Sequence, residues 1–429
     1  MLTIPSLISV VASAQAIIWQ GKIEIAEGSG ERGPWRQNES RYNYVDDPAV
    51  AIDDHGSIAV AWVNQAQKDV LFQRIDANGA VQLSRAVNVS RNGATFSWLP
   101  RIAFAHETSN KIYVLWQEII FSGGSHGGDI LFARSENGGR TFEEPLNLSR
   151  SLGGDGKGRI NADVWHNGSL DIAVGDEGKL YAAWSEYEGM LWFARSSDGG
   201  RRFSRPVRLA GGGEDKPARA PSLAIDEKGH IYLAWTVGED ESADIRVAKS
   251  ADGGATFSRP RIVHSSKGYS DAPKLVVGAK ESLHMVYAES DGGPFGRYHI
   301  RYTHSENGSL DFSAPRELTK LSPVSLASAA YPALSIDAKG RLYVLWEVFQ
   351  NYLRRPRGLA LIVSSDGGKT FTLPRQVPES ADPSGGSNGS HQGFLTKKLA
   401  VNRAGSVAIV NSSLKENERS RVWLVRGRT

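Results

Sequence analysis

The stretch PSLAIDEKGHIYLAW, Pro221 to Trp235, decides the fold because variants of it recur along the whole chain. It contains two runs in which apolar and other residues alternate, joined by an Asp-x-x-Gly turn. This pattern predicts a β-hairpin with a tight turn. The six further copies are PAVAIDDHGSIAVAW from Pro48, PRIAFAHETSNKIYVLW from Pro100, SLDIAVGDEGKLYAAW from Ser169, PKLVVGAKESLHMVY from Pro273, PALSIDAKGRLYVLW from Pro332 and KLAVNRAGSVAIV from Lys398.

Two more strand-like runs follow the hairpin in each full unit. In the unit that begins at Pro221, they are DIRVAKS (Asp244 to Ser250) and PRIV (Pro260 to Val263). Four antiparallel strands in each of seven units, without a convincing helix, predict an all-β protein, a seven-bladed β-propeller. The aromatic residue that ends most hairpins is expected to pack between neighbouring blades. These markers are Trp62, Trp116, Trp184, Trp235, Tyr287 and Trp346, with Val410 in the last copy.

The two ends of the chain are expected to close the ring. IIWQGKIEIAEG (Ile17 to Gly28) is strand-like and can pair with RVWLVRG (Arg421 to Gly427), which would remove an exposed sheet edge. We therefore predict one propeller domain over residues 17–429. Residues 1–16 are a candidate signal peptide, since they are apolar and end in Ala-Gln-Ala, although no Lys or Arg precedes them. They predict a secreted or periplasmic protein; the alternative is a first strand with a misassigned start.

Composition and charge exclude several classes of function. The 429 residues include 50 Lys and Arg against 47 Asp and Glu, and no basic run is present, so nucleic-acid binding is not expected. The absence of cysteine excludes thiolate metal sites and cysteine nucleophiles. No pair of His has the spacing of zinc ligands, and no later segment is long and apolar enough to span a bilayer. We expect a monomer without a metal or cofactor, with a glycan as its ligand; a calcium requirement stays open.

A second repeat lies between the third and fourth runs of the unit. SADGGATFSRP starts at Ser250, and related turns start at Ser135, Ser196, Ser305 and Ser364. Because Ser, Asp and Asn side chains bond nearby amides and Gly supplies positive φ, we interpret these turns as structural. The pattern S-x-D-x-G-x-T-F is the Asp box, so the chain resembles the Asp-box (BNR-repeat) propellers of the sialidase-like superfamily. That resemblance implies a protein that acts on or binds glycans.

The propeller face opposite the Asp boxes is expected to carry the functional site. In a four-stranded meander, the second-to-third loops and the blade connections lie there, and longer loops carry most functional residues. Convergent carboxylates, His, Tyr, Arg and Trp predict a polar sugar site. The catalytic candidates are Tyr331, Asp47, Asp46, Glu186, Tyr187 and His166; the substrate-binding candidates are Arg219, Arg41, Arg36, Trp98, His126, Glu118, Asp271 and His391.

The resemblance to exo-sialidases implies roles for a few of these residues. That family uses a Tyr nucleophile assisted by a Glu, an Asp as acid and base, and three Arg that bind the substrate carboxylate. Tyr331 lies on a late blade, as the Tyr of the family does. By the same resemblance, Asp46 or Asp47 would be the acid, and Arg219 is a candidate for one of the three arginines.

One departure from the family motif changes the expected substrate. The Arg-Ile-Pro motif of the family reads Asp46-Asp47-Pro48 in this chain. An Asp in place of that Arg would repel the carboxylate of sialic acid. We therefore predict an exo-acting glycoside hydrolase for a different sugar; Arg36 or Arg41 in the long first connection is the alternative source of the missing cation.

Two other functions stay open on the sequence alone. Seven-bladed polysaccharide lyases also resemble this chain, and they remove a proton from a uronate with His or Tyr while cations neutralise the carboxylate. His166, Tyr187, His126 and Arg219 could fill those roles. The third function is a propeller without catalysis that binds a glycan or a protein through the same face.

Overall fold

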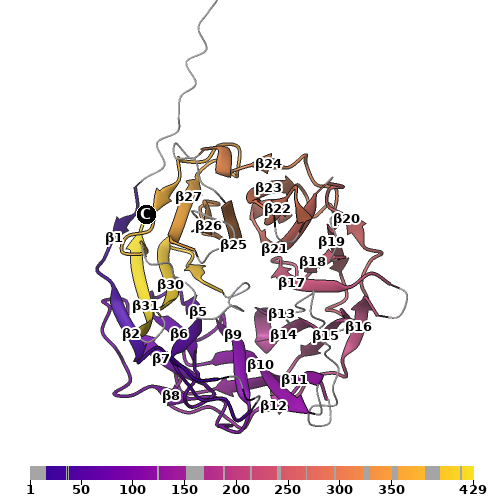
Figure 1. Ribbon diagram of the computed structural model, residues 1–429. Helices are drawn as coiled ribbons and strands as arrows, with labels where there is room; N and C mark the ends of the chain where they lie inside the picture. The colour runs from indigo at the N-terminus through magenta and orange to yellow at the C-terminus, as the bar shows by residue number, and fades with distance from the viewer. Residues whose placement is uncertain are drawn as a thin grey trace, which may run out of the picture.

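The chain forms a ring of antiparallel sheets with almost no helix, as Figure 1 shows. The structure, a computed structural model, describes residues 16–34, 36, 38–122, 125–150, 169–186, 189–212, 215–238, 243–266, 268–293, 296–321, 328–349, 356–381, 397–415 and 418–429, with the backbone alone over 120–127. Among these residues we find no helix with the length and apolar character needed to cross a membrane. The predicted seven-bladed propeller is confirmed.

Six blades are four-stranded meanders that follow one another along the chain. Blades 1 and 2 consist of β5 (Val45–Ile52), β6 (Ile58–Asn64), β7 (Asp69–Ile75) and β8 (Val87–Asn88), then β9 (Phe96–Phe104), β10 (Ile112–Ser122), β11 (Ser125–Ser135) and β12 (Leu146–Asn147). Blades 3 and 4 consist of β13 (Ser169–Val174), β14 (Leu180–Ser185), β15 (Leu191–Ser196) and β16 (Val207–Ala210), then β17 (Ala218–Ile225), β18 (Ile231–Val237), β19 (Asp244–Ser250) and β20 (Arg261–Ile262). Blades 5 and 6 consist of β21 (Tyr269–Val277), β22 (Leu283–Ser290), β23 (Tyr298–Ser305) and β24 (Arg316–Glu317), then β25 (Ser328–Ile336), β26 (Leu342–Phe349), β27 (Gly358–Ser364) and β28 (Arg375–Gln376).

The seventh blade joins the two ends of the chain, as predicted. Its C-terminal strands are β29 (Leu399–Val401), β30 (Ser406–Leu414) and β31 (Ser420–Arg428). The N-terminal strands β1 (Ile18–Trp19) and β2 (Ile23–Gly28) both pair antiparallel with β31. Because the outer strand comes from the other end of the chain, the ring closes by backbone hydrogen bonds and β31 has no open edge. The candidate signal peptide lies outside the described residues, except for Ala16.

The repeated aromatic markers form the contacts between blades. Trp184 on β14 packs with Leu115 and Phe132 of blade 2, and Trp116 on β10 packs with Phe72 of blade 1. All seven markers are almost completely buried, Val410 included. Burial of such large apolar surfaces is the main favourable term that holds neighbouring blades together.

The inner strands of five blades carry a bulge directly opposite the marker. In blade 6, Ala330 pairs with Glu347 and Ala333 pairs with Leu345, so that Tyr331 and the following Pro lie opposite one residue. The first bulge residue has a positive φ, 55° at Tyr331. The same two-residue bulge occurs at Asp47-Pro48, Leu99-Pro100, Ala220-Pro221 and Ala272-Pro273. A bulge changes the direction of a side chain locally, and it places Tyr331 and Asp47 near the start of their strands.

The turns that we interpreted as structural share one hydrogen-bond pattern. Ser250 Oγ accepts a bond from Gly254 N at 2.8 Å and donates to Asp252 Oδ1 at 2.8 Å. The copies at Ser196 and Ser364 repeat these two bonds. In blade 3, Gly199 N of this turn donates to the carbonyl of Gly178 in the first hairpin turn. The turns therefore lie on the face of the short hairpin turns and use their polar groups for their own folding.

Replacing Ser250 by Ala tests this structural role. The variant should lower the free energy of unfolding by about 1–2 kcal/mol, because the buried amide of Gly254 loses its acceptor. Denaturant unfolding would measure the loss, and Ser258→Ala, which removes an exposed hydroxyl of the same turn, should cost less. Catalytic turnover of a glycan substrate should stay at the wild-type rate in both variants, whereas a specific loss of turnover in Ser250→Ala would contradict the structural role.

Candidate active site

The inner strands bring several candidate residues to the face opposite the recurring turns. Asp46 and Asp47 lie near the start of β5, Arg219 near the start of β17, Asp271 near the start of β21, and Tyr331 in the bulge of β25. His166, Tyr187 and His391 lie outside the described residues, as does the side chain of His126. The predicted site can therefore be built from the strand starts.

Arg219 and Asp271 form an ion pair between blades 4 and 5. Nη1 of Arg219 lies 2.9 Å from Oδ1 of Asp271, and Thr236 Oγ1 donates to the same oxygen at 3.1 Å. The guanidinium lies over the ring of Tyr269, 5.0 Å from its centroid, and also donates to its hydroxyl. Two further bonds go to the carbonyl of Gly238. A planar guanidinium held on so many sides has a fixed orientation.

Two more tyrosines extend this group towards blade 6. The ring of Tyr298, at the start of β23, meets that of Tyr269 edge-on, with 6.2 Å between centroids. Burial raises the pKa of Tyr331 well above its usual value, and Tyr298, Asp271 and Tyr269 raise it further. Burial also raises the pKa of Tyr298, so both phenols are protonated at neutral pH. We name Arg219, Tyr269, Asp271, Tyr298 and Tyr331 the tyrosine–arginine cluster.

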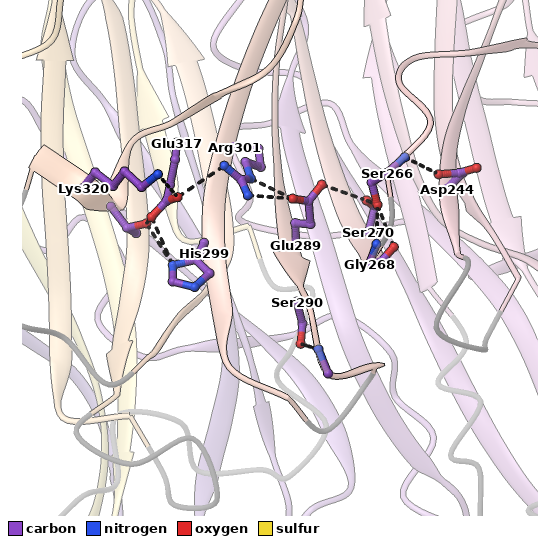
Figure 2. Close-up of polar contacts among 12 residues, drawn as sticks. Asp244, Ser266, Gly268, Ser270, Glu289, Ser290, His299, Arg301, Glu317 and Lys320 are labelled. Carbon is purple, nitrogen blue, oxygen red and sulfur yellow. Dashed lines mark hydrogen bonds and ion pairs between the residues drawn. The ribbon is translucent and has the colours of Figure 1, made fainter.

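A chain of polar contacts crosses blade 5 and supports the start of β21 (Figure 2). Its members are Lys320, Glu317, Arg301, Glu289, Ser270, Ser266 and Asp244, with His299 beside Glu317. Arg301 Nε lies 2.8 Å from Glu289 Oε1, and Glu289 Oε2 accepts from Ser270 Oγ at 3.5 Å. Glu289 is thus a buried carboxylate with a cation as its partner.

This polar chain and the tyrosine–arginine cluster lie on opposite faces of the same blade. Successive side chains of a strand alternate between the two faces, so Ser270 lies on one face and its neighbours Tyr269 and Asp271 lie on the other. The contacts of Ser270 therefore fix the backbone from which Tyr269 and Asp271 project. Glu289 and Arg301 thus support the strand that carries two members of the cluster.

A second group of charges surrounds the start of β5. Asp46 is closed to solvent and accepts a bond from Gln65 Nε2 at 2.9 Å. Burial raises the pKa of Asp46 well above its usual value, and Asp47 raises it further. The Gln65 bond and Arg32 lower that pKa, but burial is the larger effect. Two adjacent buried carboxyls cannot both ionise at low cost, so Asp46 carries the proton of the pair.

A buried ion pair from blades 6 and 7 lies near these carboxyls. Lys398, just before β29, bonds to Glu347 on β26, and both side chains are almost fully buried. Burial lowers the pKa of Lys398 to about 7, while Asp47 raises it. We name Asp46, Asp47, Glu347 and Lys398 the acid–lysine cluster. It contains three carboxyls and one cation, which favours retention of a proton on one carboxyl.

Glu118 is a buried carboxyl without a nearby cation among the described residues. It is 2% exposed and accepts bonds from Ser97 Oγ at 2.9 Å, Trp116 Nε1 at 3.1 Å, Asn92 Nδ2 at 3.2 Å and Thr95 Oγ1. Burial raises its pKa to about 7, although these bonds lower it. The Ser97–Glu118 pair of blade 2 matches the Ser270–Glu289 pair of blade 5, so the same position carries a carboxyl with a raised pKa in one blade and an ion pair in the other.

The raised pKa of Glu118 predicts a dependence of stability on pH. Its pKa is about 7 in the folded protein. In the unfolded chain it is about 4.3, so the folded state binds more protons between these values and stability falls as pH rises through this window. The contribution is about 4 kcal/mol in total. Glu118→Gln should remove this part of the dependence in denaturant titrations from acid to neutral pH. Exposed Glu306→Gln should retain the full slope, and the same slope in Glu118→Gln would contradict the assignment.

The other described candidates are not members of the two clusters. Arg36 and Arg41 are exposed on the first connection, and the arginine that acts on Asp46 is Arg32, over the rings of Tyr42 and Tyr44. Trp98 is partly buried against Phe96 and Ile119. Glu186 lines a cavity of about 440 Å³ with Trp184, Trp192, Arg150, Arg205, Ser149 and Pro206.

One group on the opposite face has the composition of a metal site. Asp226, His230 and Glu281 present atoms that lie within 4.8 Å of one another. However, Asp226 Oδ2 already bonds His230 Nδ1 at 2.7 Å, and Lys228 bonds Glu281. The equivalent position of blade 6 carries Arg341 in place of His230, with its Nε 2.6 Å from Asp337. An arginine cannot bind a metal, so this position holds the hairpin turn through a contact with its Asp in blades 4 and 6, and the group is explained without a metal.

Sequence reasoning missed Tyr298, Arg32 and Lys398. Tyr298 is the first residue of β23, the third strand of blade 5. The candidates were chosen from the starts of first strands and from the loops, so Tyr298 was not among them. The sequence did contain a signal for Lys398. Two lysines, Lys397 and Lys398, stand just before the last inner strand, whereas five other blades carry a Pro there, preceded by an apolar residue, an acidic residue or Tyr. Two consecutive lysines at a core position predict a buried charge partner.

Comparisons with known proteins match the fold. No family model and no curated protein sequence matches the chain. Among solved structures, polysaccharide lyase Uly1 is 10% identical with a TM-score of 0.54, over 96% of this chain and 99% of that chain. A protein of unknown function from Dyadobacter fermentans DSM 18053 is 9% identical with a TM-score of 0.54, over 95% and 99%. The GH93 α-L-arabinofuranosidase of Fusarium graminearum is 13% identical with a TM-score of 0.49, over 76% and 91%.

Sialidases and a family-43 glycoside hydrolase are also among the structural neighbours. Identities of this size show a shared propeller architecture and no more, because one fold hosts many chemistries. By name, these neighbours include glycoside hydrolases and a polysaccharide lyase.

Proposed function

We propose that this protein is an exo-acting glycoside hydrolase that uses Tyr331 as its nucleophile. The observation that carries the proposal is the tyrosine–arginine cluster, in which the phenol of Tyr331 lies within the electrostatic influence of Asp271. A protonated phenol needs a carboxylate nearby to accept its proton when it attacks, and Asp271 is such a group. The bulge with φ of 55° supports this role because it fixes Tyr331 at the start of β25.

The reaction follows from the protonation states of the two clusters. Oη of Tyr331 would bond to the anomeric carbon while the bond from that carbon to the leaving oxygen breaks. Asp271 would accept the phenol proton, and the neutral carboxyl of Asp46 would donate a proton to the leaving oxygen. Water would then attack the anomeric carbon while Asp46 accepts a proton from it. The bond from that carbon to Oη of Tyr331 would break, and Asp271 would return the proton to the phenol, which frees the sugar and restores both carboxyls.

The charges of the site favour an uncharged sugar. Arg219 is neutralised by Asp271, and a carboxyl pair at Asp46 and Asp47 stands where the sialidase motif has an arginine. A substrate carboxylate would meet Asp46, Asp47 and Asp271, and the cations nearby, Arg219 and Lys398, each already bond a carboxylate. We therefore infer a neutral glycoside as the substrate, whose hydroxyls would bond Arg219 and the phenols.

A screen of defined glycans separates the candidate reactions. Release of a reducing sugar without an ultraviolet-absorbing unsaturated product supports hydrolysis. An unsaturated product from uronate polymers would replace this proposal by β-elimination, in which Tyr331 or Tyr298 handles the proton. Glycan binding on an array without turnover of any bound glycan would leave a binding protein and remove the proposed enzyme activity.

A further inference from the structure

A cavity between blades 2 and 3 takes no part in the proposed reaction. Its volume of about 440 Å³ lies within the range of small-molecule sites, and the two blades that form it lie side by side in Figure 1. No described residue of its lining belongs to the tyrosine–arginine cluster or to the acid–lysine cluster. We name it the inter-blade cavity; its lining includes Ser149 and Arg150, which follow β12, and Trp184, Glu186, Trp192 and Arg205 of blade 3.

Two tryptophans lie next to each other in this cavity. Trp184 on β14 pairs directly with Trp192 on β15, so both indoles project from the same face of blade 3. Trp192 is partly buried and packs on the apolar core that blades 2 and 3 share. Over the described ranges, the indole nitrogens of both residues are buried and have no hydrogen-bond partner. The cavity therefore contains two N–H donors that a bound molecule can satisfy.

Trp192 is an exception to the repeat. In five other blades, the residue opposite the aromatic marker on the third strand is Leu71, Leu131, Arg246, Arg301 or Ala360. The repeated architecture therefore does not require a large aromatic side chain at this position. The markers of blades 1, 4 and 6 also have an indole nitrogen without a partner among the described residues, but none of them has a second Trp opposite it. The pair of indoles is specific to blade 3.

Blade 2 shows how the protein itself can satisfy an equivalent pair. There, Nε1 of Trp116 donates to Oε2 of Glu118 at 3.1 Å, so the indole and the carboxyl group satisfy each other. The equivalent pair of blade 3 is Trp184 and Glu186, and both side chains line the cavity. Trp184 makes no such bond to any residue that the structure describes. A hydroxyl group both donates and accepts, so it suits the space beside an indole N–H and a carboxyl group.

Polar groups surround the opening of the cavity. The side chains of Arg150 and Arg205 are exposed, which places this opening at the surface. Nη2 of Arg150 donates to the carbonyl of Phe203 on blade 3 at 3.2 Å, so the guanidinium is held across the boundary between the blades. Donors and a carboxyl group thus stand around an apolar indole. A sugar unit has the matching chemistry, because its ring presents C–H groups on its faces and hydroxyls at its edge.

We propose that the inter-blade cavity binds one sugar unit of a glycan, with the ring stacked on Trp192 and its hydroxyls bonded by Arg150, Arg205 and Glu186. This is a second glycan site, because blades 4, 5 and 6 supply the tyrosine–arginine cluster. The inference shares the carbohydrate ligand with the proposed function and does not depend on hydrolysis, since its test measures binding without turnover.

Affinity electrophoresis of the full chain tests the site. Native gels that contain arabinan, galactomannan, β-glucan or alginate are run with Tyr331→Phe as the background, which prevents turnover. At least one polysaccharide should retard this protein, and the retardation at several polysaccharide concentrations gives Kd. Adding Trp192→Ala should raise Kd at least about tenfold, because it removes the stacking surface. Trp192→Phe should raise Kd less, since a ring remains. Trp19→Ala, which truncates a partly buried Trp on β1, should retain Kd.

Two more variants separate this site from the tyrosine–arginine cluster and from misfolding. If Trp192→Ala fails to fold, Arg205→Ala truncates an exposed side chain at the opening and should raise Kd at least about threefold. Arg219→Gln changes the cluster and should retain Kd. Retardation in none of the gels, an unchanged Kd in both cavity variants, or binding lost only in Arg219→Gln overturns the proposal. Absence of hydrolysis by the wild type, with binding that depends on Trp192, would remove the proposed reaction and support the cavity as a glycan site.

Discussion

Tyr331→Phe is expected to lower kcat/KM on the glycan substrate at least about a thousandfold, because the variant lacks the oxygen that would bond to the anomeric carbon. The ring of Tyr331 meets that of Phe349 with 6.0 Å between centroids, and Phe keeps this contact. Loss of activity should therefore occur without unfolding. Steady-state kinetics, with circular dichroism and thermal unfolding of the same samples, would measure both quantities.

A matched tyrosine elsewhere in the propeller serves as the control. Tyr113 on β10 is buried, and among the described residues its hydroxyl has no hydrogen-bond partner. Tyr113→Phe should therefore retain both activity and stability. Tyr298→Phe should lower kcat without abolishing it, because Tyr298 touches the cluster without attacking the sugar. Turnover of Tyr331→Phe at the wild-type rate would remove the nucleophile assignment and leave the fold assignment intact.

The fold could be predicted because its information is local and repeated. Each hairpin such as Pro221–Trp235 carries its own alternation, turn and marker, so seven weak signals report the same architecture. The closure by β1 and β2 could be predicted for the same reason, since an incomplete seventh unit leaves one strand without a partner. The bulges could not be predicted, because a bulge depends on the register between two strands.

The sequence predicted which residues lie at the starts of the inner strands, but not which of them contact one another. Asp271 and Arg219 were selected because the topology brings inner strands together, and they do form an ion pair. Their sequence separation gives no sign of that pairing, which depends on the rotation between neighbouring blades. Three charged residues of inner strands, Arg101, Asp171 and Lys274, were missed, although each stands beside apolar residues in its strand. Such an interruption in a core strand is a usable signal for buried charge.

Lys398→Met is expected to lower the free energy of unfolding by about 3–5 kcal/mol, because it removes one member of a buried, bonded ion pair. The loss should be larger than that of any surface variant, since Lys398 and Glu347 are almost fully closed to solvent. Denaturant unfolding at neutral pH would measure it. A loss of less than about 0.5 kcal/mol, the range of ordinary surface substitutions, would contradict the importance of the pair.

The double variant Lys398→Met with Glu347→Leu separates stability from chemistry. It removes both charges, so most of the lost stability should return. Lys398→Met alone also removes the cation that acts together with Asp47 while the carboxylate of Glu347 stays, so the carboxyl pair of Asp46 and Asp47 should hold its proton to higher pH. The double variant removes that anion as well, so its shift should be smaller. If Asp46 donates the proton in hydrolysis, the alkaline limb of the pH–rate profile should move upward in Lys398→Met and return towards the wild-type position in the double variant. An unchanged pH profile in a folded Lys398→Met variant would place the proton donor outside the acid–lysine cluster.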